Sequence, residues 1–151
     1  MINTASLTVR RESPLDQADW NARIARLPGT GIFHTREWAA VLHDTYGFSP
    51  VYFCATEAGR TVGLLPVMEV ASWATGKRGV SLPFTDHCEP SATSKNTAEL
   101  LLKVAQDFGR SRGWKYIETR GGSNVLEPDA TPSLSFHSHH LDLPEQPDKL
   151  I

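Results

Sequence analysis

The sequence predicts an α/β domain (an α+β arrangement) in which helices flank a mixed, mainly antiparallel sheet. Two amphipathic helical patterns open the chain, a β-branched and aromatic stretch follows, and one long amphipathic pattern precedes two further strand patterns. With 151 residues, of which 40% are hydrophobic and 21% charged, the chain has the composition of one soluble domain with its own core. The expected order is therefore ααβββαββ.

Two helices are expected near the amino terminus. The first is expected from Ser13 to Leu27, because Ser13 suits the cap position and Pro14 the first helical position. The second is expected to begin at Thr35 and to end near Gly47. Apolar residues at helical spacing are expected to face the core: Trp20, Ile24 and Leu27 in the first helix, and Trp38, Val41 and Leu42 in the second.

Three strands are expected after these helices. Segments 51–56 and 61–70 predict an antiparallel hairpin with its turn at 57–60. Pro66 lies inside the second strand and cannot donate a backbone hydrogen bond, so we expect it at a bulge or on an unpaired side. A third, short strand is expected over 78–82.

A long helix is expected next, followed by two strands. Asn96 and Glu99 have the spacing of a capping box at its start. One strand is expected over 114–120 and the last over 134–143. The apolar positions that repeat with helical spacing in the long helix are Ala98, Leu101, Leu102, Ala105 and Phe108.

A set of short motifs runs through the chain in order: Trp38; Tyr46-Gly47 and Pro50; the segment 62–67; Ser81-Leu82-Pro83-Phe84 with Asp86; Tyr116-Ile117-Glu118 before Arg120; and Phe136 with Leu141-Asp142-Leu143. Together they resemble the first half of FemAB-like proteins. These are GNAT-like acyltransferases that include the peptidoglycan interpeptide-bridge aminoacyltransferases and relatives in exopolysaccharide gene clusters. The resemblance implies one GNAT-like domain over 1–143, the first of two in the family, with 144–151 as a tail or a linker to a second domain.

The resemblance implies a function in amide-bond formation. The chain would be the acceptor-binding domain of a FemAB-type acyl- or aminoacyltransferase that acts on a cell-wall or polysaccharide precursor. It would be inactive alone, and its partners would be a small-molecule acceptor and a second GNAT-like domain. A different class of function stays open: a non-catalytic binding or assembly module that forms a homodimer through an exposed sheet edge.

The resemblance also raises the question of a cofactor. Acyl-CoA-binding GNAT domains hold the pyrophosphate on a glycine-rich turn before the long helix, where backbone N–H groups meet the phosphates. The corresponding segment here, 85–95, has no glycine and carries Asp86 and Glu89, whose charges repel phosphate. We therefore expect no cofactor in this domain. An acyl-CoA or aminoacyl-tRNA donor is expected to need the second domain.

The segment from Ser81 to His87 follows a predicted strand, at the sheet rim where ligands of α/β proteins tend to bind. Ser81 and Phe84 are candidate substrate-binding residues. Asp86 and His87 are the candidate catalytic residues: Asp86 would accept hydrogen bonds from an acceptor amine or hydroxyl, and His87 would exchange a proton near neutral pH. In the alternative interpretation, Asp86 caps a turn and His87 is only solvated.

Four further residues are candidates for substrate binding. Arg36 and Arg120 have the guanidinium fork that binds phosphate or carboxylate, and the alternative for each is a surface ion pair. Trp38 and Tyr46 are suited to stack on a sugar ring, and the alternative for both is a place in the core.

Composition and spacing argue against several other classes. The net charge of −2 gives no support for generic nucleic-acid binding. Cys54 and Cys88 are too few for a disulfide framework and suit a reducing, cytoplasmic location. No apolar run approaches the ~18 residues of a membrane span. His137 and His139 share one face of a predicted strand, but no further ligand stands at a fixed spacing, so no metal site is expected.

Overall fold

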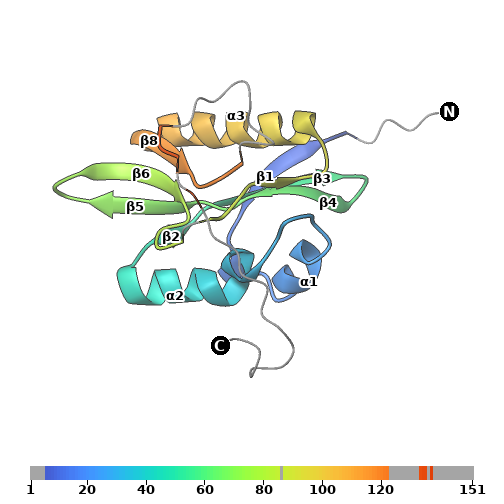
Figure 1. Cartoon of the computed structure of the whole chain (residues 1–151), viewed down its shortest axis with the longest axis horizontal. Helices are drawn as coiled ribbons and strands as arrows, with labels where there is room; N and C mark the ends of the chain where they lie inside the picture. The colour runs from blue at the N-terminus through green and yellow to red at the C-terminus, as the bar shows by residue number, and fades with distance from the viewer. Residues whose placement is uncertain (1–5, 86, 123–132, 136, 138–151) are drawn as a thin grey trace.

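The computed structural model describes residues 6–85, 87–122, 133–135 and 137. A twisted layer of strands lies between helices (Figure 1): α3 (Lys95–Arg112) covers one face, and α1 (Trp20–Ile24) and α2 (Arg36–Tyr46) cover the other. The predicted class, with helices flanking a mixed and mainly antiparallel sheet, is confirmed. No helix in these described ranges is long and apolar enough to cross a membrane.

Within the described residues, the strands form two four-stranded sheets. All neighbouring pairs are antiparallel except β6 (Gly76–Ser81) and β8 (Trp114–Thr119), which are parallel and are connected through α3. The carboxyl ends of β6 and β8 therefore meet at one edge. The sheet order β1-β3-β4-β7 comprises Thr8–Glu12, Tyr52–Glu57, Arg60–Leu65 and Ser91–Ala92, and the order β2-β5-β6-β8 comprises Ser49–Pro50, Met68–Ser72, Gly76–Ser81 and Trp114–Thr119.

One bent hairpin passes through both sheets. The segment expected as a single strand over 61–70 is two strands, β4 and β5, which lie in different sheets. The break falls at Pro66, because proline has no N–H to donate to a ladder. The opposite arm breaks at Val51, whose N–H donates to the carbonyl of Val67 at 2.8 Å and keeps the arms together.

The first predicted helix, Ser13–Leu27, is wrong as a single element. It consists of the one-turn 3₁₀ helix η1 (Pro14–Asp16) and the short α1, because Gln17 between them has an extended backbone with φ −119° and ψ 107°. The cap at Ser13 is confirmed, since its Oγ accepts the N–H of Leu15 at 3.2 Å.

Helices α2 and α3 lie where the amphipathic patterns predict them. Thr35 caps α2, and Gly47 ends it with a φ of 69°. The cap predicted at Asn96 is wrong: the cap is Ser94, two residues earlier, and its Oγ accepts the N–H of Thr97 at 3.2 Å. Serine is an equally suitable cap, and both start sites fit the same apolar face.

Strand β1 is not predicted by the sequence pattern. Charged residues make up most of it, as is common for edge strands, and it pairs with β3 along its whole length. Its side chains alternate between the two faces of the sheet. Val9 and Arg11 lie on the α3 face, where Arg11 reaches Phe108. Glu12 lies on the α1 face and forms an ion pair with Arg23 at 2.8 Å.

The core has one part on each side of the sheet. Val41 is the one expected core residue of the helices that is exposed, at 47%. The predicted strand 134–143 falls largely outside the described residues. Buried side chains on the α1 and α2 side include Trp20, Leu42, Tyr52, Met68 and Leu82, and those on the α3 side include Phe53, Leu65, Val67, Leu101 and Ala105.

Candidate functional site

The segment 82–89, which leaves the carboxyl end of β6, is the centre of the candidate site. It lies beside the end of β8, because Cys88 and Arg120 form an isolated antiparallel bridge. It also contacts the segment before α2, since His34 Nε2 is 3.0 Å from the carbonyl of Glu89. Three elements distant in sequence therefore position this loop, which we call the rim loop.

Backbone carbonyls of the rim loop are held by buried donors. The Oγ of Ser81 donates to the carbonyl of Cys88 at 3.1 Å, and the Oγ1 of Thr85 donates to the carbonyl of Leu82 at 2.9 Å. Arg120 donates through Nη1 to the carbonyl of Thr85 and accepts the N–H of Cys88 on its own carbonyl. These bonds fix the backbone of Leu82, Thr85 and Cys88 within the rim loop.

Phe84 projects from the rim loop with an unusual backbone. Its φ is +62°, a left-handed conformation that is strained for a bulky residue, and its side chain is 60% exposed. The ring lies 4.6 Å from that of Tyr46 and 6.4 Å from that of Phe48, centroid to centroid. We call Tyr46, Phe48 and Phe84 the aromatic platform.

The end of α2 builds the other side of the aromatic platform. Tyr46 is the last residue of α2, and the left-handed turn at Gly47 brings Phe48 back to stack on it at 5.5 Å. The carbonyl of Phe48 lies 2.9 Å from Nδ1 of His43, which fixes this turn. Tyr46 is 51% exposed, so two of the three rings offer apolar surface to solvent. Such rings suit the apolar face of a sugar or another flat ligand.

An imidazole and a carboxylate follow the aromatic platform along the rim loop. Nε2 of His87 is 3.3 Å from Oε1 of Glu89, and the same oxygen accepts the N–H of Gly122 at 3.2 Å. Asp86, the other predicted catalytic residue, lies outside the described residues. From the sequence, Glu89 was expected only to repel phosphate. Its position two residues after His87 was the sequence feature that could have indicated an interaction between these two side chains.

A buried cysteine and histidine underlie the rim loop without forming a nucleophilic pair. His34 is 3% exposed, and its Nδ1 accepts the N–H of Gly31, so its Nε2 carries the proton and donates to the carbonyl of Glu89. Burial lowers the pKa of His34 and raises the pKa of the Cys88 thiol to about 12. The Sγ of Cys88, 3.7 Å from Nε2, therefore stays a thiol.

The remaining predicted site residues are dispersed. Arg36 begins α2, where its Nη2 donates to the carbonyl of Leu15 at 3.3 Å. Trp38 packs edge-on against Phe33. Both lie near the start of α2, and ten residues of helix place Arg36 about 15 Å from Tyr46. Of the predicted residues, the structure brings together Tyr46 and Phe84, with Arg120, Ser81 and His87 along the adjoining loop.

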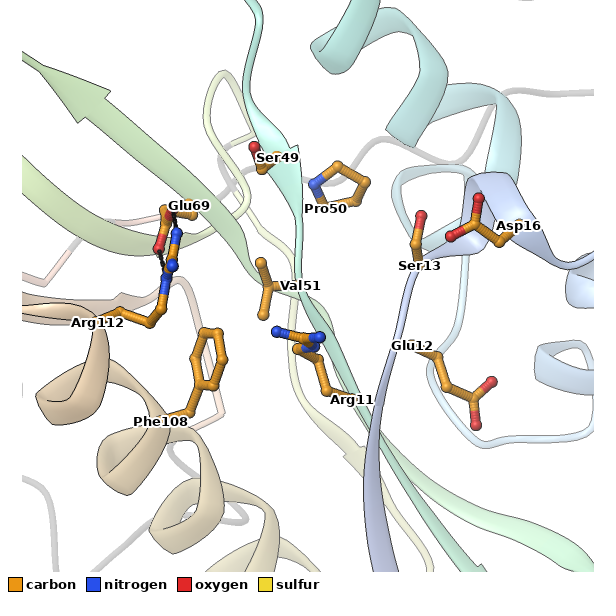
Figure 2. A pocket seen from close by; sticks show the side chains of 10 residues that line it. All are labelled: Arg11, Glu12, Ser13, Asp16, Ser49, Pro50, Val51, Glu69, Phe108 and Arg112. Atoms are coloured by element: carbon orange, nitrogen blue, oxygen red, sulfur yellow. Dashed lines mark hydrogen bonds and ion pairs between the residues drawn. The ribbon is translucent and has the colours of Figure 1, made fainter.

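A separate hollow of about 370 Å³ lies against the α3 side of the sheet. None of the predicted site residues lines it, and Figure 2 shows it open between α3, β2 and the end of β1. Among the described residues, no group of three His, Cys, Asp or Glu side chains could hold a metal ion. The lining residues are Arg11, Glu12, Ser13, Asp16, Ser49, Pro50, Val51, Glu69, Phe108 and Arg112.

Several solved structures with a similar arrangement are acetyltransferases. A GNAT family acetyltransferase from Staphylococcus aureus subsp. aureus is similar with a TM-score of 0.57 and 12% identity over 90% of this chain and 99% of that one. The chain has the GNAT acetyltransferase fold. An aminoglycoside acetyltransferase from an uncultured soil metagenomic sample, in complex with sisomicin, is similar with a TM-score of 0.58 and 11% identity over 90% and 97%.

A third GNAT-fold structure, the ribosomal-protein-alanine N-acetyltransferase from Brucella melitensis biovar Abortus, has a TM-score of 0.55 and 17% identity over 91% of this chain and 99% of that one. Identities this low show a shared fold. A scan against protein-family models and a search of curated proteins find no match to the sequence.

Proposed function

We propose that this GNAT-fold domain binds the amine acceptor of a FemAB-type acyl- or aminoacyltransferase, and that the acceptor carries a sugar ring, as cell-wall and polysaccharide precursors do. The observation that carries the proposal is the aromatic platform. Tyr46 and Phe84 expose ring surface beside the carboxyl ends of β6 and β8, where ligands of α/β proteins tend to bind. The strained backbone of Phe84 is the kind of feature that concentrates at ligand sites.

Several structurally similar proteins act on amino sugars, which supports this substrate class. One is the aminoglycoside acetyltransferase with bound sisomicin, and another is a glucosamine-6-phosphate N-acetyltransferase from Arabidopsis thaliana, with a TM-score of 0.54. In this chain the aromatic platform would hold the sugar. The polar end of the rim loop would then face the amine.

The transfer itself forms one amide bond. The acceptor nitrogen loses a proton and attacks the acyl carbonyl carbon, so a C–N bond forms while the C–S bond of an acyl thioester or the C–O bond of an aminoacyl ester breaks. We assign His87 as the group that takes the single proton released when the neutral amine nitrogen forms this bond, with Glu89 holding its imidazole at 3.3 Å. The departing thiolate or alkoxide takes that proton up, which balances the reaction.

The hydrogen bonds at the start of α3 support the proposal that the acyl donor binds outside this domain. The N–H of Thr97 is bonded to the side chain of Ser94, and the segment leading to α3 is tied to β4 by the bond from Thr93 N to the carbonyl of Val62 at 2.9 Å. Backbone N–H groups at a helix start are what a pyrophosphate binds. We therefore propose that a second GNAT-like domain supplies the acyl-CoA or aminoacyl-tRNA site.

The aromatic platform can be tested by titrating the chain with glucosamine and with a soluble disaccharide-peptide fragment of peptidoglycan, followed by NMR chemical shifts. Saturable binding is expected, with shifts centred on Tyr46, Phe48 and Phe84. Phe84→Ala should weaken binding about fivefold, because one aromatic contact is worth about 1 kcal/mol.

Trp73→Ala is the matched control, because Trp73 is a fully exposed aromatic residue outside the aromatic platform. It should leave the affinity unchanged. Binding that is insensitive to Phe84→Ala, or that Trp73→Ala weakens equally, would contradict a specific platform.

A further inference from the structure

Some of the charged side chains that line the hollow beside α3 have an ion-pair partner there, and others do not. On one side of the hollow, three hydrogen bonds hold the carboxylate of Glu69. Arg112 donates to both of its oxygens at 2.8 and 3.1 Å, and Trp114 Nε1 donates to it at 2.6 Å. The guanidinium beside it and this indole lower the pKa of Glu69, so the carboxylate is ionised and fully paired. This side of the hollow is rigid and electrically neutral.

Arg11 is left with no carboxylate partner among the described residues. Its guanidinium carbon lies 5.1 Å from the centroid of the Phe108 ring, which fixes the group beside the hollow without neutralising it. The neighbouring Glu12 is not available, because it is paired with Arg23 on the other face of β1.

Asp16 is the second charge without an ion-pair partner in the described part of the chain. It lines the hollow from η1 together with Ser13, and Figure 2 shows both on the side opposite α3. The hollow therefore has one unneutralised cation toward α3 and one unneutralised anion across from it. A site with this polarity complements a ligand that carries both charges, and it repels neither end.

We propose that this hollow binds a small zwitterion with amino-acid chemistry, whose carboxylate pairs with Arg11 and whose ammonium group pairs with Asp16. The hollow, of about 370 Å³, lies within the size range of small-molecule sites. The guanidinium of Arg11, held over the Phe108 ring, has the fork of donors that binds a carboxylate in bidentate fashion. The proposal is independent of the acceptor site, because no rim-loop or aromatic-platform residue lines the hollow.

Calorimetric and NMR titrations of the full chain test this proposal with four probes. L-alanine and L-alanyl-L-alanine carry both charges, acetate carries only the anion, and methylamine only the cation. At least one zwitterion should bind about tenfold more tightly than either half-probe, which corresponds to ~1.4 kcal/mol. Equal affinity for acetate would overturn the proposal in favour of a simple anion site, and no saturable binding of either zwitterion would overturn it altogether.

Arg11→Gln and Asp16→Asn should each weaken zwitterion binding about tenfold while changing the free energy of unfolding by no more than about 1 kcal/mol. Both side chains are exposed and make no ion pair within the described residues, and Arg11 loses only its contact with the Phe108 ring. Arg10→Gln is the matched control. Arg10 is an exposed arginine on the same strand whose side chain points to the opposite face. Equal losses for Arg10→Gln and Arg11→Gln would contradict the assignment.

Discussion

At the scale of single residues, His34 links the segment before α2 to the rim loop. Each of its ring nitrogens forms a hydrogen bond with a backbone group: Nδ1 accepts the N–H of Gly31 at 3.1 Å, and Nε2 donates to the carbonyl of Glu89 at 3.0 Å. Protonation of Nδ1 would remove its acceptor role and place a charge in the core. The fold therefore requires the neutral imidazole.

Stability should consequently fall as the pH drops below the ordinary histidine pKa of ~6.5. Burial lowers the pKa of His34 in the folded state. Between that lowered value and the ordinary one the unfolded chain binds a proton that the folded chain does not, so the free energy of unfolding decreases with falling pH. Urea titrations at about pH 7.5 and 5.5 measure this decrease.

His34→Gln is expected to cost about 1–3 kcal/mol near pH 7.5, because backbone groups of Gly31 and Glu89 lose their partner. It should also flatten the pH dependence in that window. The lowered pKa of Glu69 acts at more acidic pH and does not interfere. An unchanged slope in His34→Gln would show that His34 is not the titrating group.

At the scale of elements, α3 packs closely on β4 at Gly63. A Cβ added at Gly63 would lie 2.6 Å from Cγ2 of Thr97 and 2.9 Å from Cδ1 of Leu101. Only glycine fits this position without movement of α3. The same approach fixes where α3 begins relative to the first sheet.

Gly63→Ala should therefore destabilise the protein by about 1–3 kcal/mol, the usual cost of overpacking a core. Chemical denaturation measures the change, and Thr97→Ser in the same chain should recover part of it by removing the nearest methyl group. Gly31→Ala is the control: nothing lies within 4 Å of the added Cβ, so a change within about 0.5 kcal/mol is expected. Equal effects at both glycines would contradict the packing argument.

At the scale of the whole molecule, the layered GNAT fold does not by itself determine whether a donor binds. The connection from β6 to α3 runs through the rim loop and β7, which pairs with β4. This connection contains no glycine, and Ser94 already caps α3. These features support the proposal that the donor binds outside this domain.

We accordingly expect calorimetry to detect no saturable binding of acetyl-CoA at concentrations up to about 1 mM. A dissociation constant of that size corresponds to a binding free energy of only ~4 kcal/mol. The aminoglycoside N-acetyltransferase crystallised with CoA, which is structurally similar with a TM-score of 0.56, is a suitable positive control. Stoichiometric binding with micromolar affinity would overturn the proposal that the donor site lies outside this domain.

Helices α2 and α3 and the strands between them that carry β-branched patterns were predictable from the sequence, because hydrophobic periodicity and caps are local signals. The hairpin turn near Gly59 was predictable for the same reason. The division of 61–70 into two strands was signalled by Pro66, although not its separation into two sheets. Strand β1 was not predicted, because charged residues make up most of it and it has no alternating apolar pattern. It is stabilised by pairing with β3.

The sequence alone determined the fold class, the helix faces and the absence of glycine before α3, all of which are properties of neighbouring residues. Tertiary structure alone decided the candidate sites. Phe84 meets Tyr46 across 38 residues of chain, and Arg11 and Asp16 line one open hollow together with Phe108 and Arg112 of α3. Such meetings depend on how the sheet bends and how closely α3 approaches it, and these follow from packing between segments that no local pattern relates.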